Sequence, residues 1–415
     1  MPKAPERSAV IGWGSISPLG NNPSAAWTAV LNGQSGISHL EDEWSKDLSV
    51  RIAGRVPESA FEELDPLLRR RSDRCAQLAL LAARQAWTMA QPHCSGLSQD
   101  RIAVVLGTGI GGLSTMHEQH CQLSTGGPSR VNPLTVPMLI PDAPAGQVAI
   151  DLELHGGAHT PVSACASGAE ALMLAQMLLN DDRADLVLAG GAEAPVNRLG
   201  LVGFSAMRAL STTNDKPQEA SRPYSSQRNG FVLSEGSGVL ALMRERDAPK
   251  QAVLGWQVAC GSSSDGYHIV PPEPQGMQAS RAIDDALNRA GISPQDLCAI
   301  QAHATGTVLG DLAESLALRR SLGSALDRIP VHAPKGQLGH LLGAAGAVET
   351  ILAFQALGDG ILPRNLNCDP VDPEIMLNLN SANHTSLPDG DSKRFLLKNT
   401  FGFGGHNISL ILSSP

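Results

Sequence analysis

Short apolar runs alternate with longer amphipathic stretches through the first half of this chain. Runs that are apolar at nearly every position predict buried strands, and four stand out: SAVIGWGSI (8–16), RIAVVLG (101–107), ADLVLAGG (184–191) and GSGVLALM (236–243). Residues 73–90 carry a broad apolar face and predict a helix. Asn22 and Pro23 suit the N-cap and first turn of another helix, which Gly33 ends. Buried strands that alternate with helices are typical of an α/β fold with largely parallel sheets.

The pattern starts again near residue 250. AVLGW (252–256) repeats AVIGW (9–13) with one change, although five residues alone do not establish a duplication. The elements predicted after it are a helix at 276–291, a strand at 298–305, a helix from Asp311, a strand at 329–335, a helix at 340–357 and a strand at 408–414. We therefore predict two similar halves, residues 1–251 and 252–415, packed as one unit.

Composition narrows the possible partners and location. The chain has 415 residues with 31 basic and 40 acidic side chains, and this net charge of −9 argues against nucleic acid as the main partner. Its 7 cysteines are irregularly spaced with no CxxC pair, which indicates a reducing, cytoplasmic environment. The longest apolar run, 169–179, is too short to span a membrane. Residues 1–13 lack the apolar segment of a secretory signal.

Cys165 lies in TPVSACASGAEALMLAQMLL (160–179), where a short extended segment meets a predicted helix. A helix N-terminus carries partial positive charge, which favours a thiolate, and its unpaired N–H groups are available to an oxyanion. The neighbouring residues are small and leave room for a substrate. The pattern therefore indicates a nucleophile, and the alternative is a packed cysteine, since cysteine is among the most buried residue types.

Two histidines have unusual surroundings. His303 lies in QAHATGTVLGD, and His340 follows Lys335 in PKGQLGHLLGAAGAVE; each motif comes after a predicted strand and is rich in glycine. Together with SACASG around Cys165 and the tail FGFGGHN, these motifs resemble the elongating β-ketoacyl-acyl carrier protein synthases, in order and over nearly the whole chain. The GGHN tail, with His406, is similar to the actinobacterial branch of that family.

The resemblance implies a fold and an activity. The implied fold is the α/β thiolase fold, which is duplicated in five layers, α-β-α-β-α, and forms a homodimer. The implied reaction is decarboxylative condensation of malonyl-acyl carrier protein with an acyl chain held on Cys165, in fatty acid elongation. The acyl carrier protein is then the partner, and neither a cofactor nor a metal is needed. A type II polyketide ketosynthase shares this chemistry and stays open as the alternative.

The resemblance also implies roles for individual residues. Cys165 would hold the acyl group, while neutral His303 and His340 would donate hydrogen bonds to the malonyl thioester oxygen. The backbone N–H groups of Cys165 and Phe403 would form the oxyanion hole. Lys335 would orient the site and pair with Glu349, and Glu314 is a second supporting carboxylate.

Further residues would contact the substrate or its carrier. The implied substrate-binding residues are Thr305, Thr307, Asp265, His268 and Phe401, with Phe403 also acting as a gate. An ordinary turn is the alternative for the loop of Asp265, Tyr267 and His268. Basic side chains expected to dock the carrier protein are Arg69, Arg70, Arg71, Arg74 and Arg208, with a solvated helix face as the alternative. Thr213 stands where the family often has arginine. Residues 107–112 and Met138 would line the acyl pocket at the dimer interface.

Other classes of protein fit less well. Gly107, Gly109 and Gly112 form G-x-G-x-x-G after a strand, but no second strand with an acidic residue follows at dinucleotide-binding spacing. HEQHC (117–121) lacks zinc-ligand spacing. A degradative thiolase needs a second cysteine near the C-terminus, and a papain-like peptidase needs a different cysteine context. A non-catalytic chain-length partner would lack Cys165.

Overall fold

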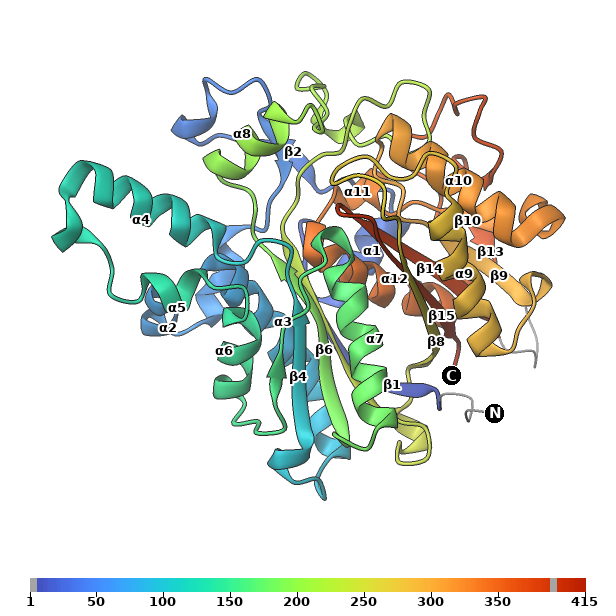
Figure 1. Cartoon of the computed structure of the whole chain (residues 1–415), viewed down its shortest axis with the longest axis horizontal. Coiled ribbons are helices and arrows are strands. Elements are labelled where there is room, and N and C mark those ends of the chain that lie inside the picture. The colour runs from blue at the N-terminus through green and yellow to red at the C-terminus, as the bar shows by residue number, and fades with distance from the viewer. Residues whose placement is uncertain (1–5, 389–393) are drawn as a thin grey trace.

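The computed structural model describes residues 6–388 and 394–415, and a mixed sheet runs through it (Figure 1). Residues 1–5, part of the stretch in which we expect no secretory signal, lie outside the described residues. The sheet begins with β5 (Ala158–His159), β4 (Ile102–Gly107), β6 (Leu186–Glu193), β7 (Gly236–Arg244) and β1 (Ser8–Ile16). It continues through β8 (Gly255–Ser264), β15 (His406–Ser413), β14 (Phe395–Gly402), β9 (Leu297–Gln301), β10 (Pro330–His332) and β12 (Asn378–Leu379).

The strand directions repeat in the two parts of the sheet. From β1 outward, β7 is antiparallel to both neighbours, and β6, β4 and β5 are parallel. From β8 outward, β15 is antiparallel to both neighbours, and β14, β9 and β10 are parallel. β1 and β8 pair antiparallel where the two parts meet, with Ala9 opposite Trp256. The limits of the two predicted halves stay a prediction.

The expectation of largely parallel sheets is wrong, although the α/β class is confirmed. Antiparallel ladders place β7 between β1 and β6, and β15 between β8 and β14. β14 and β15 are joined only by the short turn at Gly404 and Gly405, both at positive φ. A turn this short can join only antiparallel strands, because parallel strands need a long crossover.

Helices form layers on both faces of the sheet. α7 (Ser167–Asn180) and α12 (Ala345–Asp359) contact each other and the strands of both parts, so they form the central layer. α3 (Arg74–Ala90) packs against β1 and β7 in the first part of the sheet. α9 (Met277–Ala290) packs in the same way against β8 and β15 in the second part (Figure 1). The remaining helices are α1 (Pro23–Leu31), α2 (Pro66–Arg71), α4 (Leu113–Gly126), α5 (Thr135–Leu139), α6 (Ala143–Asp151), α8 (Arg198–Ala206), α10 (Val308–Leu322) and α11 (Lys335–Leu338). The short strands β2 (Ile37–His39) and β3 (Ile52–Gly54) pair together, as do β11 (Ile361–Leu362) and β13 (Thr385–Ser386).

Most predicted elements exist, but several boundaries in the second half were wrong. The helix predicted from His340 begins only at Ala345, because Leu342 adopts a positive φ of 46° that no α-helix accommodates. β9 ends at Gln301 and β10 at His332, so His303 and Lys335 both follow their strands directly. Of the AVLGW repeat, only Gly255 and Trp256 belong to β8. The early boundaries, including the Asn22 cap of α1, agree with the prediction.

His332 makes stability depend on pH. It is buried, neither ring nitrogen has a hydrogen-bond partner among the described residues, and burial lowers its pKa to about 3. The unfolded chain therefore binds the proton first, so the free energy of unfolding falls as pH drops below about 6.5. At pH 4.5 this group alone costs about 2.5 kcal/mol relative to pH 7.

We expect His332→Phe to lose this part of the acid sensitivity. Urea unfolding of wild type and variant at pH 7 and pH 4.5 measures it, since the difference of differences isolates one side chain. Equal acid sensitivity in both proteins would contradict the assignment.

Candidate active site

Cys165 is held in a strained turn at the start of α7. It lies in the 3₁₀ turn Ala164–Ala166, is 4% exposed, and follows Ala164 at a positive φ of 52°. Ser167 secures the turn: its Oγ accepts from the Ser163 N–H at 2.9 Å and lies 2.7 Å from the Ala164 carbonyl, to which it can donate. A non-glycine residue in this region of φ costs energy and persists only when its surroundings enforce it. The sequence places this cysteine correctly at the junction with a helix.

The structure brings the two predicted histidines to this cysteine. His340 Nε2 lies 3.1 Å from Cys165 Sγ. The rings of His303 and His340 are 5.4 Å apart, centroid to centroid, in an edge-to-face arrangement. The rings of His303 and Phe401 are 5.9 Å apart, centroid to centroid, also in an edge-to-face arrangement. A thiol and two imidazoles from three distant segments therefore share one buried space.

Two lysines and a glutamate form an ion-pair network behind the histidines. Lys335 Nζ is 2.6 Å from Glu349 Oε1, and Lys398 Nζ is 2.9 Å from Glu349 Oε2; all three side chains are fully buried. Lys335 Nζ also donates to the His303 carbonyl at 2.6 Å and lies 3.4 Å from His303 Nδ1. An ammonium group only donates, so Nδ1 faces a donor, which favours the tautomer with the His303 proton on Nε2.

Electrostatics keep both imidazoles neutral. Burial, then the charge of Lys335, holds the pKa of His303 and the pKa of His340 well below the usual value. Neutral imidazoles keep one N–H donor each, which suits them to stabilise a developing negative charge.

The thiol itself is not activated at rest. Burial raises the pKa of Cys165 to about 12, although Lys335 and the backbone N–H groups of Phe403 and Cys165 act to lower it. The prediction that the helix start favours a thiolate is therefore wrong for the resting site, because the cost of burying the charge is the largest effect. The proton must leave during attack, and His340 Nε2 is placed to accept it. The two N–H groups that face the sulfur are those predicted for an oxyanion hole.

Buried carboxylates shape the loop that carries His303. Glu314 accepts hydrogen bonds from the backbone N–H groups of His303 at 2.8 Å and Ala304 at 2.7 Å. Asp311 accepts from the Gly306 N–H at 3.0 Å, and burial raises its pKa to about 7. These bonds hold Ala304 at a positive φ of 33°. The predicted supporting carboxylate Glu314 thus holds the backbone of the His303 loop, and it also accepts from the side chains of Tyr224 and Asn399, each at 3.3 Å.

A cavity of about 90 Å³ opens onto the sulfur. Its lining includes the predicted residues Cys165, Asp265, His303, Thr305, Thr307, Glu314, His340, Phe401 and Phe403. Thr305 and Thr307 lie with their hydroxyl oxygens 2.9 Å apart. His268 does not line the cavity: it is exposed, and its Nδ1 accepts from the Val270 N–H in its own loop. The loop turns this ring outward, away from the cavity, so the substrate contact of His268 stays a prediction.

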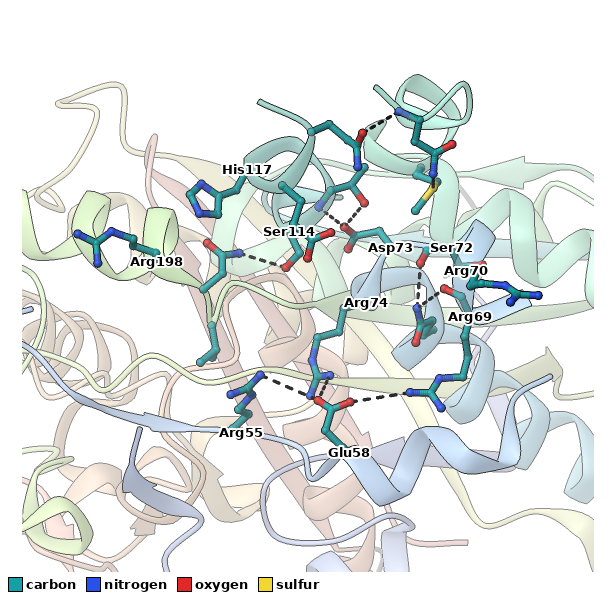
Figure 2. Close-up of a pocket in the computed structure, with 18 of the residues that line it drawn as sticks. Arg55, Glu58, Arg69, Arg70, Ser72, Asp73, Arg74, Ser114, His117 and Arg198 are labelled. Atoms are coloured by element: carbon teal, nitrogen blue, oxygen red, sulfur yellow. Dashed lines mark hydrogen bonds and ion pairs between the residues drawn. The ribbon is translucent and has the colours of Figure 1, made fainter. Parts of the chain in front are cut away.

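A separate, larger cavity of about 810 Å³ lies among the predicted docking arginines (Figure 2). The Arg74 guanidinium pairs with the fully buried Glu235 at 2.7 Å and with Glu58 at 2.6 Å, which makes it less available for docking than the sequence-based prediction assumed. Arg55 and Arg69 also approach Glu58, each at 4.0 Å. Arg70 and Arg71 are exposed and make no ion pair with any described residue, and Arg208 is exposed beyond α8. Met138 lines this larger cavity and not the one at Cys165.

The glycine motif packs against the nucleophile turn, and the HEQHC segment lies on the helix α4. The N–H groups of Gly109 and Ile110, where a phosphate would bind, donate to the Glu193 carboxylate. A Cβ at Gly107 would lie 2.3 Å from the Ser167 carbonyl, so this glycine permits close packing on that turn.

The described residues include no group of side chains that could hold a metal ion, at HEQHC or elsewhere. Within the same residues no helix is long and apolar enough to cross a membrane.

Sequence reasoning missed two buried charges at the site. Lys398 lies within the apolar strand β14 and pairs with Glu349. Glu193 ends the apolar strand β6 and accepts hydrogen bonds from the segments beside Cys165 and His340. A lone charge in an otherwise apolar run was the available signal, because such a residue is buried only when its charge is satisfied.

Comparison with known proteins gives consistent results. Residues 6–248 match the family described as "Beta-ketoacyl synthase, N-terminal domain", and residues 254–369 match the corresponding C-terminal domain. A 3-oxoacyl-[acyl-carrier-protein] synthase 2 of Staphylococcus aureus is 37% identical over 98% of both chains. The Synechocystis protein of that name is 36% identical over 98% of this chain and 97% of its own. A ketosynthase solved with a type II PKS acyl-carrier protein (AntDE:AntF) has a TM-score of 0.90 at 28% identity, covering 99% of this chain and all of that one. The predicted thiolase-type fold is thereby confirmed.

Proposed function

Because this chain belongs to the beta-ketoacyl synthase family, we propose that it elongates fatty acyl chains as a 3-oxoacyl-acyl carrier protein synthase. It is an acyltransferase of the ketosynthase type. The observation that carries the proposal is the buried group of Cys165, His303 and His340, with His340 Nε2 at 3.1 Å from the sulfur. The 37% identity to a synthase of this name over 98% of the chain supports the fatty acid pathway.

The first half-reaction loads the acyl chain. The Cys165 sulfur attacks the acyl thioester carbon, and His340 Nε2 takes the thiol proton as the charge on sulfur develops. The N–H groups of Cys165 and Phe403 stabilise the oxyanion. When the intermediate collapses, the carrier's pantetheine sulfur leaves and receives the proton from His340. His340 Nδ1 has no partner among the described residues, so nothing fixes the ring in one tautomer.

The second half-reaction forms the carbon–carbon bond. A malonyl thioester loses CO2, and the electron pair moves to the thioester carbonyl, whose oxygen accepts hydrogen bonds from neutral His303 and His340. The resulting enolate carbon attacks the Cys165 acyl carbonyl. The carbon–sulfur bond breaks and leaves the Cys165 thiolate, which takes up one proton from solvent to regenerate the thiol; each cycle therefore consumes one proton. Lys335 supports this step by keeping His303 neutral and oriented.

The carrier protein delivers both substrates. Thr305 and Thr307 line the small cavity and suit hydrogen bonds to the pantetheine arm. Arg70, Arg71 and Arg208 are exposed cations on a chain of net charge −9, so they offer local attraction to an acidic carrier. The AntDE:AntF neighbour is a ketosynthase in complex with an acyl-carrier protein, which supports this class of partner.

We also propose a cytoplasmic homodimer that needs no cofactor. Exposed apolar side chains on the adjoining helices α4, α5 and α6, namely Leu123, Val136 and Ile150, support a contact between two copies. The two family matches end at residue 248 and begin at residue 254, which supports a division of the chain near residue 251.

A type II polyketide ketosynthase is the second candidate. It is favoured by one observation, the TM-score of 0.90 to a ketosynthase that was solved with a type II PKS carrier protein. Turnover with acyl carrier proteins bearing saturated chains of increasing length, compared with poly-β-keto chains, distinguishes the two pathways. Copurification of a dedicated second subunit would favour the polyketide pathway.

Intact mass spectrometry tests the main proposal. Incubation with acyl-carrier protein should add one acyl group, which peptide mapping places on Cys165, and malonyl-carrier protein should then discharge it as the elongated product. A protein whose free thiol gains no adduct from several saturated and polyketide donors would refute a condensing enzyme.

We expect His303→Ala to separate the half-reactions. Loading requires Cys165 and His340, so the acyl adduct should still form, whereas condensation should fall about 10²–10³-fold through loss of one donor to the enolate. Single-turnover assays of acylation and of malonyl-dependent product release measure the two steps. Equal losses in both steps would contradict a role confined to the second.

A further inference from the structure

Glu193 is a buried carboxylate without a counter-cation. It ends β6, is 1% exposed, and forms no ion pair with another described residue. A buried charge of this kind is costly unless hydrogen bonds satisfy it. Neither half-reaction gives it a chemical step.

Four donors from two segments converge on this carboxylate. Oε2 accepts from the Gly109 N–H at 2.6 Å and from the Gly343 N–H at 3.0 Å. Oε1 accepts from the Thr108 hydroxyl at 2.9 Å and from the Ile110 N–H at 3.2 Å. A carboxylate has about four acceptor positions, so its capacity is used in full. Gly109 and Gly343 share one oxygen, although 234 residues separate them in the chain.

The first segment supports the nucleophile. The Thr108 carbonyl oxygen lies 3.1 Å from Ser167 Oγ, the atom that also accepts from the Ser163 N–H in the Cys165 turn. A Cβ at Gly109 would lie 3.4 Å from the Ala164 carbonyl oxygen. Residues 108–110 therefore lie directly against the turn that presents the sulfur.

The second segment carries His340. Gly343 lies three residues after this histidine, within the turn in which Leu342 has a positive φ. A Cβ at Gly343 would lie 2.5 Å from the Gly109 nitrogen and 2.7 Å from Glu193 Oε2. The two segments are thus in close contact, and the shared carboxylate oxygen joins them.

We propose that Glu193 is a positioning residue that fixes the separation of Cys165 and His340 by joining residues 108–110, which support the Cys165 turn, to the segment that carries His340. Its chemistry suits this task, because one rigid group with two acceptor oxygens can serve donors from both segments at once. This inference rests on the proposed function, because the proposed function is what makes the 3.1 Å contact between Cys165 Sγ and His340 Nε2 part of catalysis.

Two substitutions distinguish the effect of the length of the Glu193 side chain from the effect of its charge. Glu193→Gln keeps the side-chain length and keeps one oxygen for the Gly109 and Gly343 N–H groups, which belong to the two segments. The Thr108 hydroxyl can rotate to accept from the new NH2 group, so only the 3.2 Å bond from the Ile110 N–H is lost. Glu193→Asp keeps the charge but is one methylene shorter, so it cannot serve both segments in place. A misplacement of about 1 Å in an active site can cost about 10²-fold in rate.

The experiment compares condensation kinetics, iodoacetamide alkylation of Cys165 and thermal unfolding in the full-length protein. For Glu193→Asp we expect kcat to fall about 10²-fold, with KM within about threefold of wild type. Alkylation of Cys165 should slow about tenfold, since His340 no longer takes up the thiol proton in place. Glu193→Gln should recover most of both rates. Asp73→Asn is the matched control for alkylation, because Asp73 is a buried carboxylate that accepts from Thr115 and Cys75, which carry no proposed chemistry.

A second variant perturbs the same contact from the other side. Gly343→Ala places a methyl group against the Gly109 nitrogen, so it should reproduce the kcat loss of Glu193→Asp. The double variant should then cost less than the sum of the two single losses.

Two results would overturn the proposal. In the first, Glu193→Asp keeps both kcat and the alkylation rate within threefold of wild type. In the second, Glu193→Asp and Glu193→Gln lose equal kcat, and the loss is proportional to the loss of thermal stability. A wild-type enzyme that fails to condense any substrate would refute the proposed function instead, while the alkylation rates would still test Glu193.

Discussion

Replacing Cys165 by alanine should abolish condensation, with a loss of at least about 10³-fold in kcat/KM. Among the described residues, the Cys165 sulfur is the only thiol that lines the cavity shared by His303 and His340. His340 Nε2 lies 3.1 Å from it. Removing it removes the acyl-enzyme, so the enolate formed from malonyl-carrier protein has no electrophile to attack. The measurement is turnover with acyl- and malonyl-carrier protein, together with intact mass after acyl donor alone.

For Cys165→Ala we also expect one activity to continue. Decarboxylation of the malonyl thioester depends on His303 and His340, which Cys165→Ala leaves in place, so release of CO2 without product should continue. Cys121→Ala is the matched control: Cys121 is exposed on α4, and this variant should load and condense like wild type. An acyl adduct that persists in Cys165→Ala, or moves to Cys121, would contradict the assignment of the nucleophile.

Glu349→Gln should lower the free energy of unfolding by about 3–5 kcal/mol. Glu349 is fully buried and bridges Lys335 at 2.6 Å and Lys398 at 2.9 Å. The neutral amide leaves two buried ammonium groups without the carboxylate that balances their charge. Breaking a buried ion pair is costly for this reason, even where the intact pair contributes little. Urea unfolding at pH 7 measures the loss.

Glu58→Gln provides the matched control for this prediction. Glu58 also meets several cations, Arg55, Arg69 and Arg74, but its side chain is 64% exposed, so water screens the charges. Its loss should be below about 1 kcal/mol. Adding Lys398→Met to Glu349→Gln should restore part of the stability, because one of the two repelling charges disappears. A Glu349→Gln loss no greater than that of Glu58→Gln would refute the network as a stabilising element.

Sequence patterns predicted the elements and chemical groups better than their surroundings. Asn22 capping, the apolar strand runs and the junction at Cys165 are local properties, and each appears in the structure where expected. The antiparallel insertion of β7 and β15 is a property of chain topology, which no local pattern reports. The helix start at Ala345 was missed because the positive φ of Leu342 is imposed by tertiary contacts.

Charges were the hardest part to predict. The net charge does not indicate which arginine lacks an ion-pair partner. Arg74 pairs with Glu235, which lies 161 residues away in the chain. The helix-start argument for the Cys165 thiolate considered only favourable dipoles, whereas burial raises its pKa to about 12. Both differences have one origin: burial depends on the assembled fold, and it changes the energy of a charge more than its sequence neighbours do.

The position of β1 at the centre of the sheet has a consequence for how the chain folds during synthesis. β1 comprises residues 8–16, yet its partners are β7 at residues 236–244 and β8 at residues 255–264. β1 is the first strand to leave the ribosome, and neither of its edges can pair until more than half of the chain has been synthesised. Such distant pairings slow folding and leave an apolar strand open to wrong partners in the interval. We expect nascent chains that end before β8 to depend on chaperones and to aggregate when released.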